Sequence, residues 1–215
     1  MDENRRICEA DRMIRLARRA VSYFVNKTGR GRWIFKRFCN PDGFEWARYL
    51  ARWGSLYSVG SNVWINVGCN IADPSLVRLG NNIALSDCTL FCHDGAVFFS
   101  TLYNVKLDSV GPVDIRDNCF IGHGAIIMPC VTIGPGSIVA AGAVIRKDVP
   151  PGVVVGGNPA RVFCTVEDLM KKFEARCNDY PWMDLIRERT GSYDPSLESA
   201  LMEMRVEYFF GEPPK

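Results

Sequence analysis

Residues 115–150 decide the fold, because they repeat in units of six: IRDNCF, IGHGAI, IMPCVT, IGPGSI, VAAGAV and IRKDVP. Every unit starts with Ile or Val, and its fifth residue is small or β-branched. These fifth residues are Cys119, Ala125, Val131, Ser137, Ala143 and Val149. A period of six fits neither the 3.6-residue turn of an α-helix nor the 3.5-residue repeat of a coiled coil. It predicts short strands separated by tight turns.

An earlier block, residues 59–90, has the same period as VGSNVW, INVGCN and IADPSL, then slips by two residues and continues as LGNNIA and LSDCTL. About eleven units follow the rule in total. Three strands close one coil of about 18 residues, and stacked coils bury a continuous aliphatic core. A β-sandwich would keep so many units in register only by coincidence, so the pattern favours a β-solenoid.

The stretch IGPGSIVAAGAVIRKDVPPGVVVGGNPARV, Ile133–Val162, closely resembles the hexapeptide-repeat acyltransferases, and most of all the sugar and xenobiotic O-acetyltransferases. The resemblance covers roughly Val59–Val162. It implies a mainly β protein built on a left-handed parallel β-helix, with α-helices at both ends. It also implies acetyl-CoA as cosubstrate, no required metal, and a homotrimer with active sites between subunits.

The flanks divide the chain into three expected parts. Residues 1–58 form a helical segment that caps the solenoid, residues 59–162 form the β-helix with a loop extruded at about 93–112, and residues 163–215 form C-terminal helices. Within the first part, residues 3–26 predict an amphipathic helix with arginines on its polar face. That helix packs on its own fold or a trimer mate, or else rests on an anionic membrane surface.

Composition narrows the function classes. The chain has 215 residues, a net charge of +2 and an ordinary globular balance, so no nucleic-acid partner is expected. Its nine cysteines include no CxxC pair, which indicates reduced thiols in a cytoplasm. Two histidines are too few for the three zinc ligands of a β-helix carbonic anhydrase. Without a signal peptide or an apolar span, the expected location is cytoplasmic, including the inner face of the membrane.

His93 is the first candidate for the base that acyl transfer to a hydroxyl needs, because histidine suits proton transfer near neutral pH. After His93 the segment DGAVFFSTLYNVKLDSVGP breaks the six-residue period, which predicts the extruded loop. Loops on rigid scaffolds concentrate catalysis and binding. The catalytic histidine of the resembled family lies just ahead of such a loop, and CHDG matches it. The alternative is a turn histidine bonded to backbone.

The expected mechanism is direct attack of the acceptor hydroxyl on the thioester, with His93 taking the proton. A serine or cysteine nucleophile would require its own base, so no covalent intermediate is expected. Asp94 and Asp87 are both candidates for the group that orients His93, and a backbone carbonyl would also serve. A backbone N–H should stabilise the oxyanion.

The second histidine, His123, lies one full coil before Ala141 in the repeat. The resemblance implies that it contacts the cofactor, whereas the alternatives are a solvated surface histidine or the base itself. Gly142 allows close backbone approach, and cations suit the phosphates of coenzyme A. By resemblance, the coenzyme A contacts include Ala141, Arg146, Lys147 and Arg161, although the family more often has threonine where Arg146 stands.

Asp73 matches a family position that binds acceptor hydroxyls, and Asn66 and Asn70 are further candidates for the substrate site. Asparagine is also common in turns, because it tolerates the left-handed conformation. The expected acceptor is a sugar or a surface-polysaccharide precursor. An amino-sugar N-acetyltransferase, a small-molecule (antibiotic) acetyltransferase and an inactive β-helix scaffold are the alternatives.

Overall fold

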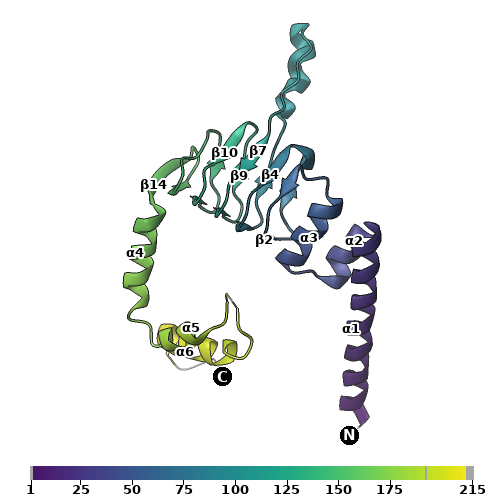
Figure 1. The fold of residues 1–215 in the computed structure, drawn as a ribbon, viewed down its shortest axis with the longest axis vertical. Helices are drawn as coiled ribbons and strands as arrows, with labels where there is room; N and C mark the ends of the chain where they lie inside the picture. The colour runs from purple at the N-terminus through teal and green to yellow at the C-terminus, as the bar shows by residue number, and fades with distance from the viewer. Residues whose placement is uncertain (1, 192, 212–215) are drawn as a thin grey trace. The chain divides into compact units, whose positions relative to one another are not determined.

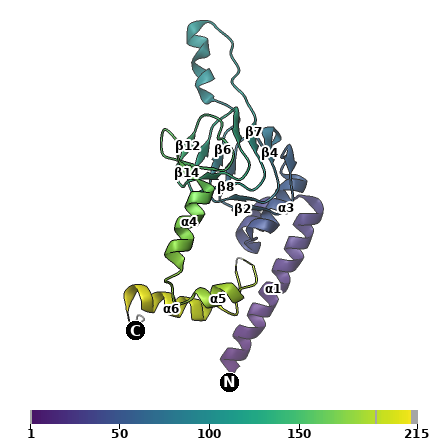
Figure 2. The ribbon, with the colours of Figure 1, turned by 60° about the vertical axis from the view of Figure 1, so that its left-hand side comes forward.

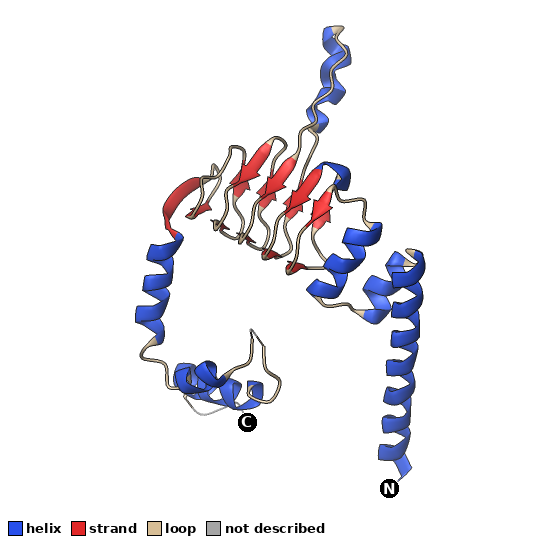
Figure 3. Ribbon diagram, viewed as in Figure 1, coloured by secondary structure: helices blue, strands red, loops and turns tan. Residues whose placement is uncertain are grey.

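A parallel β-helix forms the centre of the computed structural model, which describes residues 2–191 and 193–211 (Figure 1). Each of four coils gives one strand to each of three parallel sheets (Figure 3). The first coil consists of β1 (Ser58–Val59), β2 (Val63–Ile65) and β3 (Asn70–Ile71), and the second of β4 (Val77–Leu79), β5 (Ile83–Leu85) and β6 (Thr89–Leu90). The third coil consists of β7 (Val113–Ile115), β8 (Phe120–Ile121) and β9 (Ile126–Ile127), and the fourth of β10 (Val131–Ile133), β11 (Ile138–Val139) and β12 (Val144–Ile145). The prediction of stacked coils is confirmed.

The strand register shows where the repeat is regular and where it is interrupted. Val113 pairs with Val131, which is the separation of one regular coil. Val77 pairs with Val113 across twice that separation, so the segment between β6 and β7 adds the length of a further coil. Ser58 pairs with Arg78, and this sequence separation exceeds that of a regular coil by the two residues of the slip.

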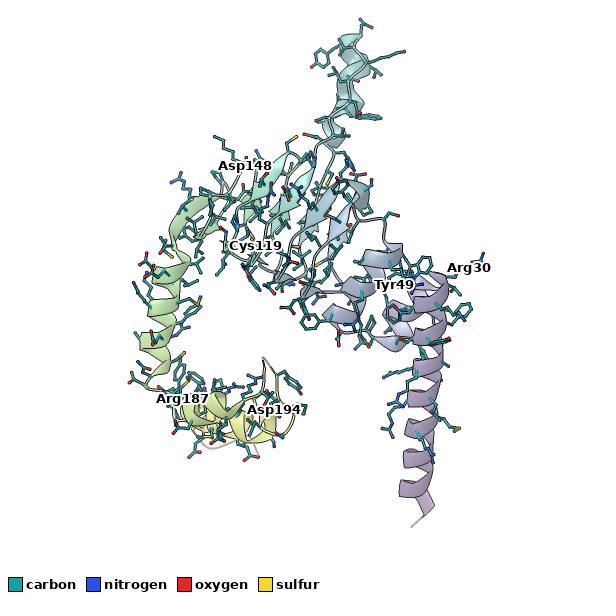
Figure 4. The ribbon with its side chains drawn as sticks, in the orientation of Figure 1. Arg30, Tyr49, Cys119, Asp148, Arg187 and Asp194 are labelled. Atoms are coloured by element: carbon teal, nitrogen blue, oxygen red, sulfur yellow. The ribbon has the colours of Figure 1, made fainter. Side chains whose placement is uncertain are left out.

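The core follows from the six-residue pattern. The first residues of the repeating units are fully buried: Ile115, Ile121, Ile127, Ile133, Val139 and Ile145. The small fifth residues are buried at the corners, including Cys119, which lies inside the β-helix (Figure 4). Ser137 is the polar exception, and its hydroxyl donates to the carbonyl of Pro150 at 2.7 Å. This bond satisfies a buried polar group that would otherwise destabilise the core.

The N-terminal elements are α1 (Asp2–Thr28), the short α2 (Arg32–Ile34), a π-helical turn η1 (Phe35–Cys39) and α3 (Gly43–Trp53). A capping box fixes the start of α3, because the side chains of Asp42 and Glu45 each accept a bond from the other's backbone N–H. The helix packs on β2 and buries Trp46 and Leu50, so it covers the first coil. Tyr49 joins α3 to the end of α1 by donating to the Gly29 carbonyl at 2.9 Å (Figure 4).

At the other end, β13 (Val153–Gly156) extends the second sheet and β14 (Arg161–Thr165) pairs with it in antiparallel sense. A separate compact unit, residues 167–215, holds most of α4 (Val166–Cys177), then α5 (Met183–Glu188) and α6 (Glu198–Phe210). Trp182 and Leu201 are its buried residues. Among the residues described, no helix has the length and apolar character needed to cross a membrane.

Helices hold more residues of this chain than strands do. "Mainly β" therefore describes the β-helix and not the whole chain. The sequence pattern leads to an overestimate of the strand content, because strands of two or three residues recur every six residues and turns occupy the remainder of each unit. The helices at both ends are confirmed.

Candidate active site

His93 lies where the chain leaves the β-helix, three residues after β6. Its Nδ1 lies 2.5 Å from Oδ2 of Asp73. The two side chains are 47% and 34% exposed, so the pair is open to an incoming substrate. A histidine and a carboxylate at this distance form the arrangement of an oriented general base.

The stacking of successive coils brings these two residues together although they are far apart in the sequence. Ile71 of β3 pairs with Leu90 of β6, so the residues that follow both strands meet at one corner. Asp73 is the N-cap residue of the 3₁₀ turn η2 (Pro74–Leu76), which lies just ahead of the two-residue slip. From this corner its carboxylate reaches the imidazole of the next coil.

The extruded loop fixes the backbone on both sides of His93. The residue forms an isolated antiparallel bridge with Val110, and the N–H of Asp94 donates to the Ser109 carbonyl at 2.8 Å. The N–H of Gly111 donates to the carbonyl of Cys92, also at 2.8 Å. Beyond this neck the 3₁₀ helix η3 (Gly95–Tyr103) projects away from the coils (Figure 2). The catalytic candidate is thus held by backbone bonds at the base of the loop.

The prediction that Asp94 or Asp87 orients His93 is wrong. Asp94 accepts from the N–H of Ala96 at 2.9 Å and caps η3 instead. Asp87 lies before β6, at a different corner. The group at Nδ1 is Asp73, which the sequence indicated only as an acceptor-binding residue. Coil stacking explains the difference, because it brings Asp73 to the same corner as His93, whereas the side chain of the adjacent Asp94 turns to the N–H of Ala96.

Chemically, a carboxylate at Nδ1 holds the neutral imidazole in the tautomer that carries its proton there. The other ring nitrogen, Nε2, is then free to accept a proton. The carboxylate also stabilises the imidazolium that forms. The pair therefore has the parts of a base near neutral pH, and nothing in its geometry requires a metal. Among the described residues there is no cluster of three or more His, Cys, Asp or Glu side chains that could hold a metal ion.

We name this edge the loop corner and define it by five residues that lie within three positions after the ends of β3, β6, β9 and β12: Asp73, His93, Met128, Arg146 and Lys147. Ile127 pairs with Leu90 of β6 on one side and with Ile145 of β12 on the other. Arg146, the residue after β12, therefore lies at a level two coils away from β6. Parallel strands are about 4.8 Å apart, which places that level about 10 Å from β6 along the axis. The residues predicted to bind the acetyl donor, acetyl-CoA, and those predicted to bind the acceptor hydroxyl therefore lie along one edge of the β-helix.

A pocket of about 360 Å³ gathers three of the predicted coenzyme A residues. Arg146, Lys147 and Arg161 line it, with aliphatic walls from β12 and the β13–β14 turn. Asp148 also lines the pocket, but its carboxylate accepts from the N–H of Thr132 at 2.8 Å. Three cations around an apolar cleft suit a ligand that carries both phosphates and an uncharged chain.

His123 lies on a second edge, the repeat corner, which we define as Asp87, His123, Ala141 and Gly142, the residues between the second and third sheets. The N–H of Gly142 donates to the His123 carbonyl at 2.8 Å, so the prediction that this histidine stacks one coil before Ala141 is confirmed. Nδ1 of His123 is 3.9 Å from Oδ2 of Asp87, beyond hydrogen-bond distance. Its side chain is 73% exposed.

The remaining acceptor candidates have structural partners. Oδ1 of Asn66 accepts from the N–H of Gly68 at 2.9 Å and closes a turn of the first coil. Asn70 begins β3, and its backbone N–H donates to the Cys88 carbonyl. No hydrogen bond links either amide to the His93–Asp73 pair within the part of the chain that the structure describes.

The family match falls on these coils. Residues 112–147 match the bacterial transferase hexapeptide (six repeats) family. The galactoside O-acetyltransferase of Escherichia coli is 34% identical over 122 residues, which are 56% of this chain and 60% of the relative. A putative acetyltransferase of Schizosaccharomyces pombe is 34% identical over 109 residues, 51% of this chain and 53% of the relative. The chain thus matches little more than half the length of these curated relatives.

Among solved structures, a maltose O-acetyltransferase from Clostridium difficile is 34% identical and covers 50% of this chain and 58% of its own, with a TM-score of 0.44. Residues 112–147 thus match the hexapeptide repeat of bacterial transferases, and the coils are similar in sequence to those of the galactoside O-acetyltransferase.

Proposed function

We propose that this chain is an acetyl-CoA-dependent O-acetyltransferase whose acceptor is a hydroxyl of a sugar or of a surface-polysaccharide precursor. The observation that carries the proposal is the 2.5 Å contact between Nδ1 of His93 and Asp73 at the base of the extruded loop. The likeness of the coils to the galactoside O-acetyltransferase of Escherichia coli supports the class of acceptor.

In the proposed reaction, His93 moves a single proton. Acetyl-CoA supplies the acetyl group as a thioester. Nε2 of His93 takes the proton of the acceptor hydroxyl as its oxygen attacks the carbonyl carbon, and delivers that proton to the sulfur that leaves. Asp73 holds the ring through Nδ1 and balances the positive charge while the proton is on histidine. A positioned base of this kind contributes about 10²–10⁴ in rate.

The chain's own cations hold the donor in this proposal. Arg146, Lys147 and Arg161 bind the phosphates of coenzyme A in the pocket they line, since ionised donors form the strongest bonds to phosphate. Gly142 and Ala141 offer backbone groups along the repeat corner, with His123 beside them. Asp73, with Asn66 and Asn70 as weaker candidates, orients the acceptor through the carboxylate oxygen that does not contact His93.

Assembly is part of the same proposal. We take the β-helix to be left-handed and the active protein to be a homotrimer, with each site completed by a neighbouring subunit. The exposed position of the His93–Asp73 pair supports this, because catalysis benefits from a site shielded from water. A neighbour packed over the loop corner would supply that shield.

The decisive experiment is acetyl transfer to a panel of sugars, amino sugars and glycans, followed by mass spectrometry. We expect a base-labile acetyl ester on a sugar hydroxyl, with release of one coenzyme A thiol per acetyl group. Base-stable acetylation of amino sugars alone would instead favour an N-acetyltransferase. Absence of transfer to any acceptor, together with absence of thermal stabilisation by coenzyme A, would leave a β-helix scaffold without activity.

A further inference from the structure

Residues 12–38 form a segment of one charge sign, which we name the basic segment. It holds nine Lys and Arg residues and no Asp or Glu: Arg12, Arg15, Arg18, Arg19, Lys27, Arg30, Arg32, Lys36 and Arg37. The chain totals +2, so the remainder carries 2 − 9 = −7. None of the nine cations forms an ion pair with a carboxylate among residues 12–191 and 193–211.

The first turns of α1 whose side chains the structure describes are exposed to solvent. Every residue from 12 to 20 is exposed, and burial begins only at Val21 and Val25. The first contact with the rest of the fold is at Arg18, whose carbonyl accepts from the Cys39 thiol at 3.5 Å. Figures 1 and 2 show α1 as one straight helix of which only the C-terminal end reaches α2. The turn before Arg18 thus presents its whole circumference outward.

An apolar stripe runs along this exposed helix. Its members and their exposed fractions are Met13 (66%), Leu16 (56%), Tyr23 (68%) and Phe24 (55%). At 100° per residue they fall within about 100° of arc. Trp33, 75% exposed on α2, is a further large apolar side chain of the basic segment. So much uncovered apolar surface on one helix indicates an interaction site.

Three arginines adjoin this stripe on one side. Arg12, Arg15 and Arg19 occupy the neighbouring arc of the helix, whereas Lys27 lies within the arc of the stripe, with its Nζ 5.7 Å from the centre of the Tyr23 ring. The other side of the stripe leads to Val21 and Val25, which pack on the fold. An apolar stripe beside a row of arginines is the composition of a helix that lies in the plane of a membrane interface.

We propose that α1 binds an anionic lipid bilayer surface, with the apolar stripe among the headgroups and the arginines on the lipid phosphates. A soluble polyanion would attract the cations but would leave the stripe uncovered. A second copy of α1 would cover the stripe but would bring nine like charges against nine. The lipid surface satisfies both features, because each Lys or Arg near anionic lipid adds to the attraction.

The proposal concerns a surface separate from the loop corner, so it stands or fails independently of the transferase activity. Its test is co-sedimentation of the full chain with vesicles of phosphatidylcholine, with and without phosphatidylglycerol, at low and high salt. We expect binding only to the anionic vesicles and a loss of binding at high salt. The triple variant R12Q/R15Q/R19Q should lower the partition coefficient about 100-fold.

A second variant, L16E/F24E, should also abolish binding, because it removes the stripe and leaves every cation in place. The matched control is K106Q/K172Q/R176Q, which removes the same charge from exposed residues elsewhere and should bind as the wild type does. Equal binding to neutral vesicles, or full binding by R12Q/R15Q/R19Q, would overturn the proposal. So would a change of oligomeric state in L16E/F24E without any vesicle binding by the wild type, since a second copy would then cover the stripe.

Discussion

The two edges of the third sheet each carry a histidine and an aspartate on neighbouring coils, yet only one of these two pairs lies within hydrogen-bond distance. At the loop corner, Nδ1 of His93 is 2.5 Å from Asp73. At the repeat corner, Nδ1 of His123 is 3.9 Å from Asp87, and the imidazole is 73% exposed. Regular coil stacking therefore brings such a pair near one another but does not complete the bond.

What the loop corner adds is irregularity. Asp73 is the N-cap residue of the 3₁₀ turn just before the two-residue slip, and the neck of the loop holds His93 by a bridge to Val110. Both departures from the six-residue period meet at one point. The comparison teaches that the repeat supplies the scaffold and its interruptions supply the reactive geometry.

The largest expected effect separates the two histidines. His93→Ala should lower kcat by about 10²–10⁴, because it removes the base. His123→Ala, at the repeat corner, should leave kcat within a few-fold and change mainly the KM for acetyl-CoA. Steady-state kinetics with both substrates varied would measure this. Loss of kcat in His123→Ala with an active His93→Ala would reverse the roles of the corners.

The next effect separates the two aspartates. Asp73→Asn keeps the shape but removes the charge at Nδ1, so kcat should fall by about 10². Asp87→Asn is the matched control and should leave kcat within a few-fold of the wild-type value. The measurement is steady-state kcat for both variants. A wild-type kcat for Asp73→Asn would show that the 2.5 Å contact has no part in proton transfer.

A smaller effect is expected at the donor pocket on the loop corner. Arg146→Gln, Lys147→Gln and Arg161→Gln each remove one cation from the pocket of about 360 Å³. Each should raise the KM for acetyl-CoA about tenfold with little change in kcat, since the lost bond serves binding. Lys172→Gln, on α4, is the control. An unchanged KM in all three pocket variants would place the phosphates elsewhere.

The smallest effect concerns the buried thiols beneath each corner. Contact with the Cys69 thiol, together with burial, raises the pKa of Cys88, and burial raises the pKa of Cys92. The same contact lowers the pKa of Cys69, which offsets part of the effect of Cys88. The unfolded thiols ionise near pH 8.5, before the folded ones. Their stabilising effect is therefore complete below about pH 8 and is lost as the pH rises, by at most about 1.4 kcal/mol per pH unit for each thiol.

Urea unfolding between about pH 8 and pH 10 would measure that loss. Cys88→Ala and Cys92→Ala should each flatten the decline, because the thiol that resists ionisation is gone. Cys130→Ala removes an exposed thiol and should keep the wild-type slope. If the free energy of unfolding declines equally steeply in all four proteins, groups other than these thiols cause the loss of stability at alkaline pH.

Much of the fold could be predicted from the sequence, because the six-residue period fixes which side chains face the core. Ile121 and Ala125 are buried as their positions in the repeat require. His93 could be located for a related reason, since it stands where the period ends. In both cases the prediction depends only on the six-residue pattern of the neighbouring sequence.

The partner of His93 could not be predicted in the same way. Its contact with Asp73 depends on how far a two-residue slip shifts a corner and on which strands pair across coils. Proximity in sequence favoured Asp94 instead, and that residue caps η3. The slip itself was visible in the sequence, and a lengthened corner one coil before a candidate base is the signal that could have identified Asp73.

The neck of the extruded loop has a consequence for how this protein can diversify. The chain departs at Cys92 and re-enters at Gly111 across a single hydrogen bond, and β7 resumes the phase that β4 set. Residues 95–108 lie beyond the neck, so insertions, deletions or grafts between these points leave both the core positions and the backbone bonds around His93 in place.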